Sequence, residues 1–315
     1  MSLRMPEAAG AHPRGVQFYP TLSCNYRCDF CFNRGLGEAS DISPHDFLSL
    51  IHILKGIGVE SIDILGGEPT LHPALPEFAS IINENNLSAV ISTNGSNIRT
   101  LRRISEAHAG GANIKIGVSV NGNNSEALND FITDCKPYVK SVAAKKTFPV
   151  PEAAAKYVGL SGINYYLIFR DAISKDDLRE TMPFFEYYEI LNELKRERNG
   201  VDGVYCAGFL PDMEVYPELE GVRCPAGTTK AAVLPNGDVY PCNLFFRHRQ
   251  FRLGNIFTDD FEVIWSNPVL DYFRVFHSNK CLRKRCGLFN RCRGGCPAVA
   301  YAVVGKLDAQ EPRCL

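Results

Sequence analysis

The sequence has 315 residues, which is enough for one large α/β domain with a small appendage. Its 34 basic and 35 acidic residues leave a net charge of −1, which excludes a general electrostatic surface for nucleic acid or an anionic membrane. Residues 1–15 contain no apolar signal core and no apolar run of about 18 residues is present, so we expect a cytoplasmic protein with no membrane or nucleic-acid partner.

Short apolar strands alternate with amphipathic helices from residue 17 to residue 198. The predicted strands are 17–22, 61–65, 89–93, 114–120, 141–148 and 164–170, the last being the last clear strand of the series. The predicted helices are 44–58, 75–86, 98–108, 126–135, 152–158 and 175–198, with a bend or restart at Pro183. This alternation predicts an α/β fold with a parallel sheet, and about six βα units favour a partial (β/α)6 TIM-like barrel over a closed eight-stranded one.

The pattern changes after residue 200, where prolines and glycines become frequent and short hairpins replace the alternation. Asn236 and Gly237 stand between apolar residues, a combination that predicts a β-hairpin turn. We therefore expect three parts, namely an N-terminal tail at 1–16, a barrel at 17–200, and a linker with a small loop-rich domain at 201–315.

Cys24, Cys28 and Cys31 form a C-x3-C-x2-C stretch directly after the first predicted strand, with Phe30 before the last cysteine. Thiolates are the usual ligands of iron–sulfur clusters, so three of them can hold three corners of a [4Fe–4S] cluster and leave the fourth iron open. A structural zinc site is the alternative, although zinc normally brings a fourth Cys or His close by. A disulfide or a chance cluster is a further alternative.

Flexible or polar residues follow three neighbouring strands, at the edge where their carboxyl ends meet. They are Gly66, Gly67, Glu68 and Pro69 after the second strand, Thr93 and Asn94 after the third, and Ser119 and Asn121 after the fourth. Two glycines allow a ligand to approach the backbone closely, and the Glu68 carboxylate can accept hydrogen bonds from an ammonium group. The alternative is that these residues only satisfy the local backbone of the turns.

Nine further cysteines follow. In a chain without an export signal, such a number favours metal ligation over a disulfide framework. Seven of them lie after residue 220, namely Cys224, Cys242, Cys281, Cys286, Cys292, Cys296 and Cys314. Zinc is again the alternative metal for such a set of cysteines. Cys135 is interpreted as a buried apolar residue, whereas Cys206 is interpreted as a cluster ligand, a hydrogen-atom donor or a packed side chain.

The stretch Cys24, Cys28, Phe30 and Cys31 resembles the C-x3-C-x-aromatic-C signature of the radical S-adenosylmethionine (SAM) superfamily. The late cysteines resemble the SPASM domain of that superfamily, which holds two auxiliary [4Fe–4S] clusters. The spacing differs at one step, because four residues separate Cys281 from Cys286 where the SPASM pattern has two.

The resemblance implies a set of cofactors and ligands. SAM would bind the open iron beside the Gly66–Pro69 motif, with Ser119 and Asn121 at its ribose or carboxylate, and its reductive cleavage would give a 5′-deoxyadenosyl radical that abstracts a hydrogen atom. Cys224, Cys242 and Cys296 would hold the inner auxiliary cluster, and Cys281, Cys286, Cys292 and Cys314 the outer one. The electron would come from a flavodoxin or a ferredoxin-type protein.

The outcome and the substrate stay open at this point. A thiol donor at Cys206 would give an epimerase, and oxidation of the substrate radical by an auxiliary cluster would give a dehydrogenase or crosslinking enzyme. Only about 15 residues precede the first strand, too few for a fused leader-recognition domain. We expect a peptide substrate, with a small molecule such as a sugar or aminoglycoside as the alternative. A non-catalytic iron–sulfur electron carrier is the remaining rival.

Overall fold

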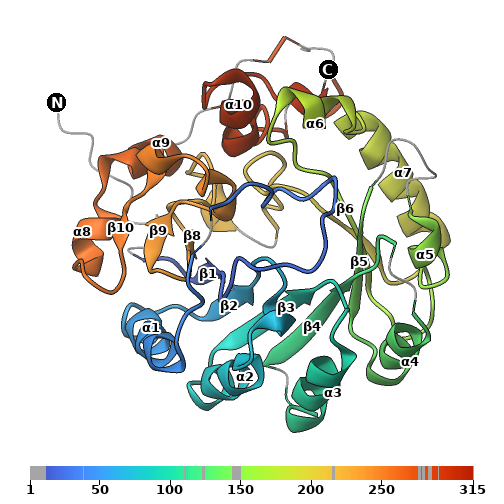
Figure 1. The fold of residues 1–315 in the computed structure, drawn as a ribbon. Coiled ribbons are helices and arrows are strands. Elements are labelled where there is room, and N and C mark those ends of the chain that lie inside the picture. Colours follow the sequence, from blue (N-terminus) through green and yellow to red (C-terminus); the bar gives the residue numbers. More distant parts are fainter. Residues whose placement is uncertain are drawn as a thin grey trace.

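One mixed sheet runs through the molecule. The structure is a computed structural model, and it describes residues 12–37, 39–109, 111, 113–122, 125–143, 150–214, 217–275, 278, 281–282, 286–289 and 291–314. Its ten strands have the order β10-β9-β8-β1-β2-β3-β4-β5-β6-β7 (Figure 1). They are β1 (Gly15–Phe18), β2 (Ser61–Ile64), β3 (Ser88–Thr93), β4 (Ile114–Ser119), β5 (Tyr138–Val142), β6 (Tyr165–Ile168), β7 (Val201–Val204), β8 (Lys230–Val233), β9 (Asp238–Tyr240) and β10 (Gly254–Asn255).

Neighbouring strands from β8 through β1 to β7 pair in parallel, while β9 and β10 pair antiparallel. The sheet curves without closing, because β10 and β7 stand at its two ends. This confirms the predicted α/β fold with a partial barrel, whose ligand-binding end lies at the carboxyl ends of the strands.

Helices cover the outer face of the parallel strands (Figure 1). Between the parallel strands the chain forms α1 (Pro44–Gly56), α2 (Leu75–Glu84), α3 (Ile98–Ala107), α4 (Glu126–Cys135), α5 (Glu152–Ala155), α6 (Lys175–Arg179) and α7 (Phe184–Glu197). The C-terminal region adds α8 (Phe261–Trp265), which contacts β10, and α9 (Asp271–Arg274) and α10 (Pro297–Val304). Within the described ranges, no helix is long and apolar enough to cross a membrane.

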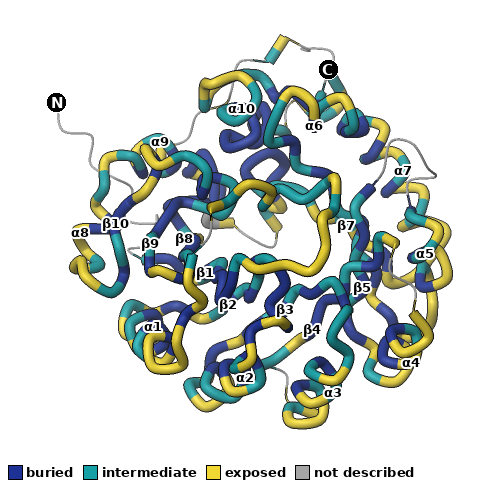
Figure 2. The backbone as a smooth tube through the Cα atoms, viewed as in Figure 1, coloured by how far each residue is buried: buried dark blue, intermediate teal, exposed yellow. Residues whose placement is uncertain are grey.

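The start of α1 shows why the sequence forms these helices. Ser43 caps the helix by accepting a hydrogen bond from the amide of Asp46, and Pro44 occupies the first turn. The buried face of α1 includes Phe47, whose ring stacks on Phe78 of α2 at 4.0 Å between centroids. In Figure 2, buried residues follow the strands and the sides of the helices that pack against them.

Three predicted elements differ from the structure. The first strand is β1, which begins and ends earlier than the predicted 17–22, so an irregular segment separates it from Cys24. The fifth strand is Tyr138–Val142 instead of 141–148, and residues 144–148 of the predicted segment lie outside the described residues. The predicted last strand was not the last, because β7 adds a further parallel strand whose Asp202 and Gly203 conceal it in the sequence.

The C-terminal region joins the same sheet. β8 pairs in parallel with β1, placing Phe18 opposite Val233, and the hairpin predicted at Asn236 and Gly237 connects β8 to β9. The strand that leads to the cysteine stretch is therefore held between β2 on one side and β8 on the other.

Candidate active site

The cysteine stretch lies in a long loop that crosses the open face of the barrel from β1 toward β6, drawn dark blue in Figure 1. Cys24 is exposed, whereas Cys28, Phe30 and Cys31 are half-buried. Partial burial raises the pKa of the Cys28 thiol, and the neighbouring Cys31 and Cys24 thiols raise it further. The three thiols thus lie near one another in this loop, which fits three ligands of one cluster.

The Gly66–Pro69 turn packs directly against the backbone that leads to Cys24. The amide of Gly67 donates to the carbonyl of Thr21 at 3.0 Å, and the amide of Glu68 donates to Ser23 at 2.8 Å. Gly66 has a φ of +130°, and a Cβ on Gly67 would lie 2.1 Å from the Ser23 carbonyl oxygen. Both glycines are therefore required for this close approach.

Glu68 is buried and joins the ends of β2 and β3. Its Oε1 accepts from the Thr93 hydroxyl at 2.6 Å and from the Thr70 amide at 3.0 Å, while its Oε2 accepts from the Asn94 amide at 2.6 Å. A carboxylate oxygen can accept more than one hydrogen bond, so Oε2 retains capacity for a further donor. Burial raises the pKa of the Cys24 thiol, and the negative charge of Glu68 raises it further. The carboxylate therefore lies near that cysteine.

Polar side chains connect the cysteine loop to the ends of the following strands. The Asn94 amide group donates to Asn25 Oδ1, and Asn25 donates in turn to Ser96 Oγ, both at 2.9 Å. Ser119 ends β4, and Asn121 follows it, with its Oδ1 accepting from the amide of Val142 at 2.7 Å. The structure thus collects all the predicted strand-end residues on one edge, while Asn121 also satisfies local backbone.

Lys140 is a barrel-lining group that the sequence analysis did not single out. It stands beside Ser119 in the register of β4 and β5, and its Nζ donates to Ser92 Oγ at 2.7 Å. The side chain passes over Gly117, where a Cβ would lie 2.6 Å from Nζ. Burial lowers the pKa of Lys140 to about 8, against an opposing effect of Asp63.

Four cysteines form the inner set. The Cys224 thiol, with burial, raises the pKa of the Cys206 thiol, and Cys296 acts on it as well, so the three side chains are neighbours. Burial raises the pKa of Cys242, and the Cys296 thiol raises it further. A Cβ on Gly208 would lie 2.6 Å from the Cys224 sulfur and 3.5 Å from the Cys206 sulfur. The structure therefore adds Cys206 to the three cysteines implied by the resemblance.

The remaining late cysteines form a second, outer set. Burial raises the pKa of Cys292, and the thiols of Cys281 and Cys286 raise it further. Burial and the Glu311 carboxylate raise the pKa of Cys314, and the thiols of Cys292 and Cys286 raise it further. These are the four that the resemblance implies for the outer cluster. Within the described ranges, no three His, Cys, Asp or Glu side chains are arranged to hold a single metal ion.

Buried charged residues hold the loops of the inner set together. Arg223, which is fully buried, donates to the carbonyl oxygens of Gly208 at 2.5 Å and Gly295 at 2.7 Å. It thereby joins the loops that carry Cys206, Cys224 and Cys296. The sequence offers no signal for this role beyond the position of Arg223 beside Cys224.

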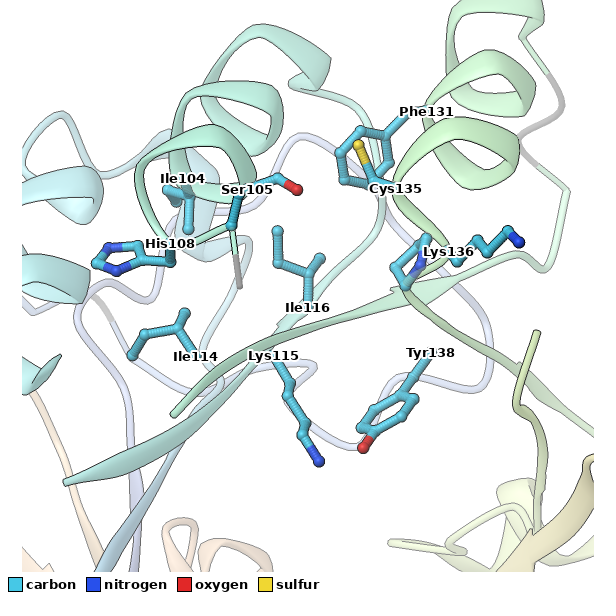
Figure 3. A pocket seen from close by; sticks show the side chains of 12 residues that line it. Ile104, Ser105, His108, Ile114, Lys115, Ile116, Phe131, Cys135, Lys136 and Tyr138 are labelled. Carbon is cyan, nitrogen blue, oxygen red and sulfur yellow. The ribbon is translucent and has the colours of Figure 1, made fainter. Parts of the chain in front are cut away.

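A cavity lies away from these residues. It measures about 310 Å³ and opens between α3 and α4, near the amino-terminal ends of β4 and β5. Figure 3 shows Cys135 beside Phe131 in its lining, which agrees with the apolar interpretation of that cysteine. None of the predicted cluster or SAM ligands lines this cavity.

Comparisons with known proteins agree with this arrangement. The family model of the radical SAM superfamily matches residues 18–184, and that of the iron–sulfur cluster-binding domain called SPASM matches residues 224–297. Mycofactocin maturase MftC of Mycobacterium tuberculosis is 24% identical over 329 residues, covering 94% of this chain and 81% of its own. The AdoMet-dependent heme synthase of Methanosarcina barkeri is 24% identical, covering 96% of both chains.

Among solved structures, Streptococcus suis SuiB bound to its precursor peptide SuiA superposes with a TM-score of 0.71 at 21% identity. The match covers 96% of this chain and 76% of SuiB. At 21% sequence identity, this structural similarity shows a shared fold and nothing more.

Proposed function

Because this chain belongs to the radical SAM superfamily and carries the iron–sulfur cluster-binding domain of SPASM proteins, we propose that it uses radical SAM chemistry to oxidise or crosslink a peptide. The observation that carries the proposal is the position of the cysteine loop. The backbone on either side of Cys24 is held at the carboxyl ends of β2 and β3, because Ser23 accepts from the Glu68 amide and Asn25 accepts from Asn94.

The residues of the chain divide the work at this edge. Cys24, Cys28 and Cys31 hold the first cluster, and bound cluster and SAM together supply one-electron cleavage and hydrogen-atom abstraction. Gly66 and Gly67 let the turn pack against the backbone that leads to Cys24, and Glu68 Oε2 offers an acceptor for the SAM ammonium group.

Cys206 completes the inner auxiliary set in this proposal. Its sulfur and that of Cys224 both lie within 3.5 Å of the position that a Cβ on Gly208 would take, and Cys296 acts on its pKa, which supports Cys206 as a fourth thiolate for this cluster. This assignment favours oxidation or crosslinking over epimerisation, because a ligand thiol is not available to return a hydrogen atom to the substrate.

Three similar proteins bear on the substrate. SuiB was solved with a precursor peptide, and MftC is named a maturase, which supports a peptide. The heme synthase matches this chain over the same extent, which keeps a small molecule as the second candidate. A flavodoxin or a ferredoxin-type protein is the proposed electron donor.

The test is anaerobic reconstitution with iron and sulfide, followed by SAM and dithionite, with 5′-deoxyadenosine as the product to measure. We expect 5′-deoxyadenosine from the reconstituted protein and from a Cys135→Ser control, and none from a Cys28→Ala variant. A protein that contains its clusters but forms no 5′-deoxyadenosine contradicts the proposal and favours a non-catalytic electron carrier. Incubation with the peptide or small-molecule products of neighbouring genes then decides the substrate class.

A further inference from the structure

The loop that carries Cys28 and Cys31 is held by arginines from distant parts of the chain. We call Arg34, Arg170, Arg247 and Asp177 the arginine clamp. Arg34 lies in the loop itself, Arg170 follows β6, Asp177 lies on α6, and Arg247 comes five residues after Cys242 in the C-terminal region.

The barrel side of the clamp is well buried. Arg170 is 8% exposed and donates to the carbonyl of Asp29 at 2.9 Å and to Asp177 at 3.4 Å. Arg34 pairs with the same Asp177 carboxylate, and its Nε donates to the carbonyl oxygen of Cys31 at 3.1 Å. Within the described residues, the Nε of Arg170 is buried with no hydrogen-bond partner.

Arg247 closes the clamp from the C-terminal region. Its Nε and Nη2 both donate to the carbonyl oxygen of Phe32 at 3.4 Å, and a Cβ on Gly35 would lie 3.4 Å from its Nη1. Burial lowers the pKa of Arg247, with a further decrease from Arg34 and an opposing effect from Cys31. A guanidinium remains charged at neutral pH, so Arg247 places a cation beside that ligand.

The charges of the clamp do not cancel. Arg34 and Arg170 share the single carboxylate of Asp177, while Arg247 donates to a carbonyl oxygen, so the clamp itself carries an excess of positive charge. The acidic Asp29 of the same loop lies beside Cys28, whereas Arg247 lies on the Cys31 side. A cluster held by three thiolates becomes more negative when it takes up an electron, and nearby positive charge favours that reduced state. The surroundings of a metal centre set its potential in this way.

We propose that Arg247 is a positioning residue that raises the reduction potential of the cluster held by Cys24, Cys28 and Cys31, an inference that rests on the proposed function. The step is the uptake of one electron by this cluster from a low-potential one-electron donor. Arg247 follows Cys242 closely in sequence, and Asn243 between them donates to the Tyr19 hydroxyl at 3.2 Å. The auxiliary-cluster region thereby acts directly on the cluster that binds SAM.

The test compares Arg247→Gln, Arg247→Lys and the wild type in anaerobic potentiometric titrations followed by electron paramagnetic resonance. The signal to follow is the one that changes when SAM is added, because that change identifies the SAM-binding cluster. We expect Arg247→Gln to shift the midpoint to a more negative potential, and Arg247→Lys to keep the wild-type midpoint because it keeps the charge. Arg249→Gln is the matched control, since Arg249 is exposed in the same segment, and its midpoint stays at the wild-type value.

An Arg247→Gln variant that has wild-type iron content and a wild-type midpoint overturns the inference. Loss of the cluster from Arg247→Gln also overturns it, because Arg247 would then act only as a structural support. Equal shifts in the Gln and Lys variants overturn the role of charge. A wild type without any SAM-responsive signal contradicts the proposed function itself, so the two failures are distinguishable.

Discussion

The carboxylate of Glu311 accepts a 2.7 Å hydrogen bond from the backbone amide of Cys296. The same carboxylate pairs with Arg313 at 2.8 Å, and Arg313 also reaches Asp171 at the end of the barrel at 2.8 Å. Glu311 and Arg313 are almost completely buried. The chain just before Cys314 therefore joins an inner-set cysteine to the barrel through buried charge.

Removing the Glu311 carboxylate leaves the buried Arg313 guanidinium with Asp171 as its remaining acidic partner. We expect Glu311→Ala to lower the free energy of unfolding by about 3 kcal/mol, because Arg313 then keeps only part of its pairing. Urea unfolding of the anaerobic protein measures the change. Asp176→Ala is the control, since the Asp176–Arg179 pair is exposed, and it leaves the stability unchanged within error. Equal stability of Glu311→Ala and wild type would refute this account.

The assignment of Cys206 predicts an iron count. A protein with three [4Fe–4S] clusters binds about twelve irons, and we expect Cys206→Ser to lose about four of them. Iron and sulfide analysis after reconstitution measures the loss, with Cys135→Ser as a control that keeps the full content. Full iron content in Cys206→Ser together with lost product formation would instead identify Cys206 as a hydrogen-atom donor.

The contact of Gly67 with the cysteine loop predicts a strong effect of a single methyl group. A Cβ at this position would lie 2.1 Å from the Ser23 carbonyl oxygen and 2.5 Å from that of Leu22, so Gly67→Ala must displace the segment before Cys24. We expect loss of 5′-deoxyadenosine formation by at least about tenfold, which corresponds to about 1.4 kcal/mol.

Gly56→Ala is the control for that experiment. Gly56 ends α1 with open space around it, so the alanine leaves activity unchanged and stability within about 1 kcal/mol of wild type. If Gly67→Ala and Gly56→Ala behave alike, the close approach is not needed.

Lys140 predicts a pH dependence of stability. Burial lowers its folded-state pKa to about 8, whereas an exposed lysine has a pKa of about 10.4. Between these values the unfolded chain binds more protons than the folded one, so the contribution of Lys140 to the free energy of unfolding rises with pH.

The difference in unfolding free energy between wild type and Lys140→Met should therefore increase from pH 8 to about pH 10.4 and stay constant below pH 8. Urea unfolding at several pH values measures it. Lys55→Met, at an exposed site on α1, gives the matched comparison and a constant difference. A falling difference for Lys140→Met has the wrong sign and contradicts the buried-ammonium account.

Much of the barrel could be predicted from the sequence because its signals are local. Ser43 and Pro44 mark the start of α1, and the apolar spacing of Phe47 and its neighbours marks its buried face. α4 has the predicted bounds, Glu126–Cys135, and α6 and α7 are separated before Pro183 as expected. The cysteine spacing identified the family, which the comparisons confirm.

The features that could not be predicted from the sequence depend on contacts between residues that are distant in the chain. Nothing local indicates that Lys230–Val233 pairs with Gly15–Phe18, because parallel pairing leaves no turn between its strands. Cys206 stood alone in the sequence, and only folding brings it to Cys224 and Cys296. The sequence does not distinguish Arg223 and Arg247 from ordinary surface arginines, because their roles depend on carbonyl groups supplied by other loops.

The pairing of β8 with β1 has a consequence for how the protein is made. During synthesis from the amino terminus, β1 acquires β2 early, but its second neighbour exists only after Val233 has left the ribosome. The cysteine loop leaves the end of β1, so its final support arrives late, together with Cys224 and Cys242. The segment that contains Cys24, Cys28 and Cys31 therefore gains its final backbone support only after most of the polypeptide has been translated.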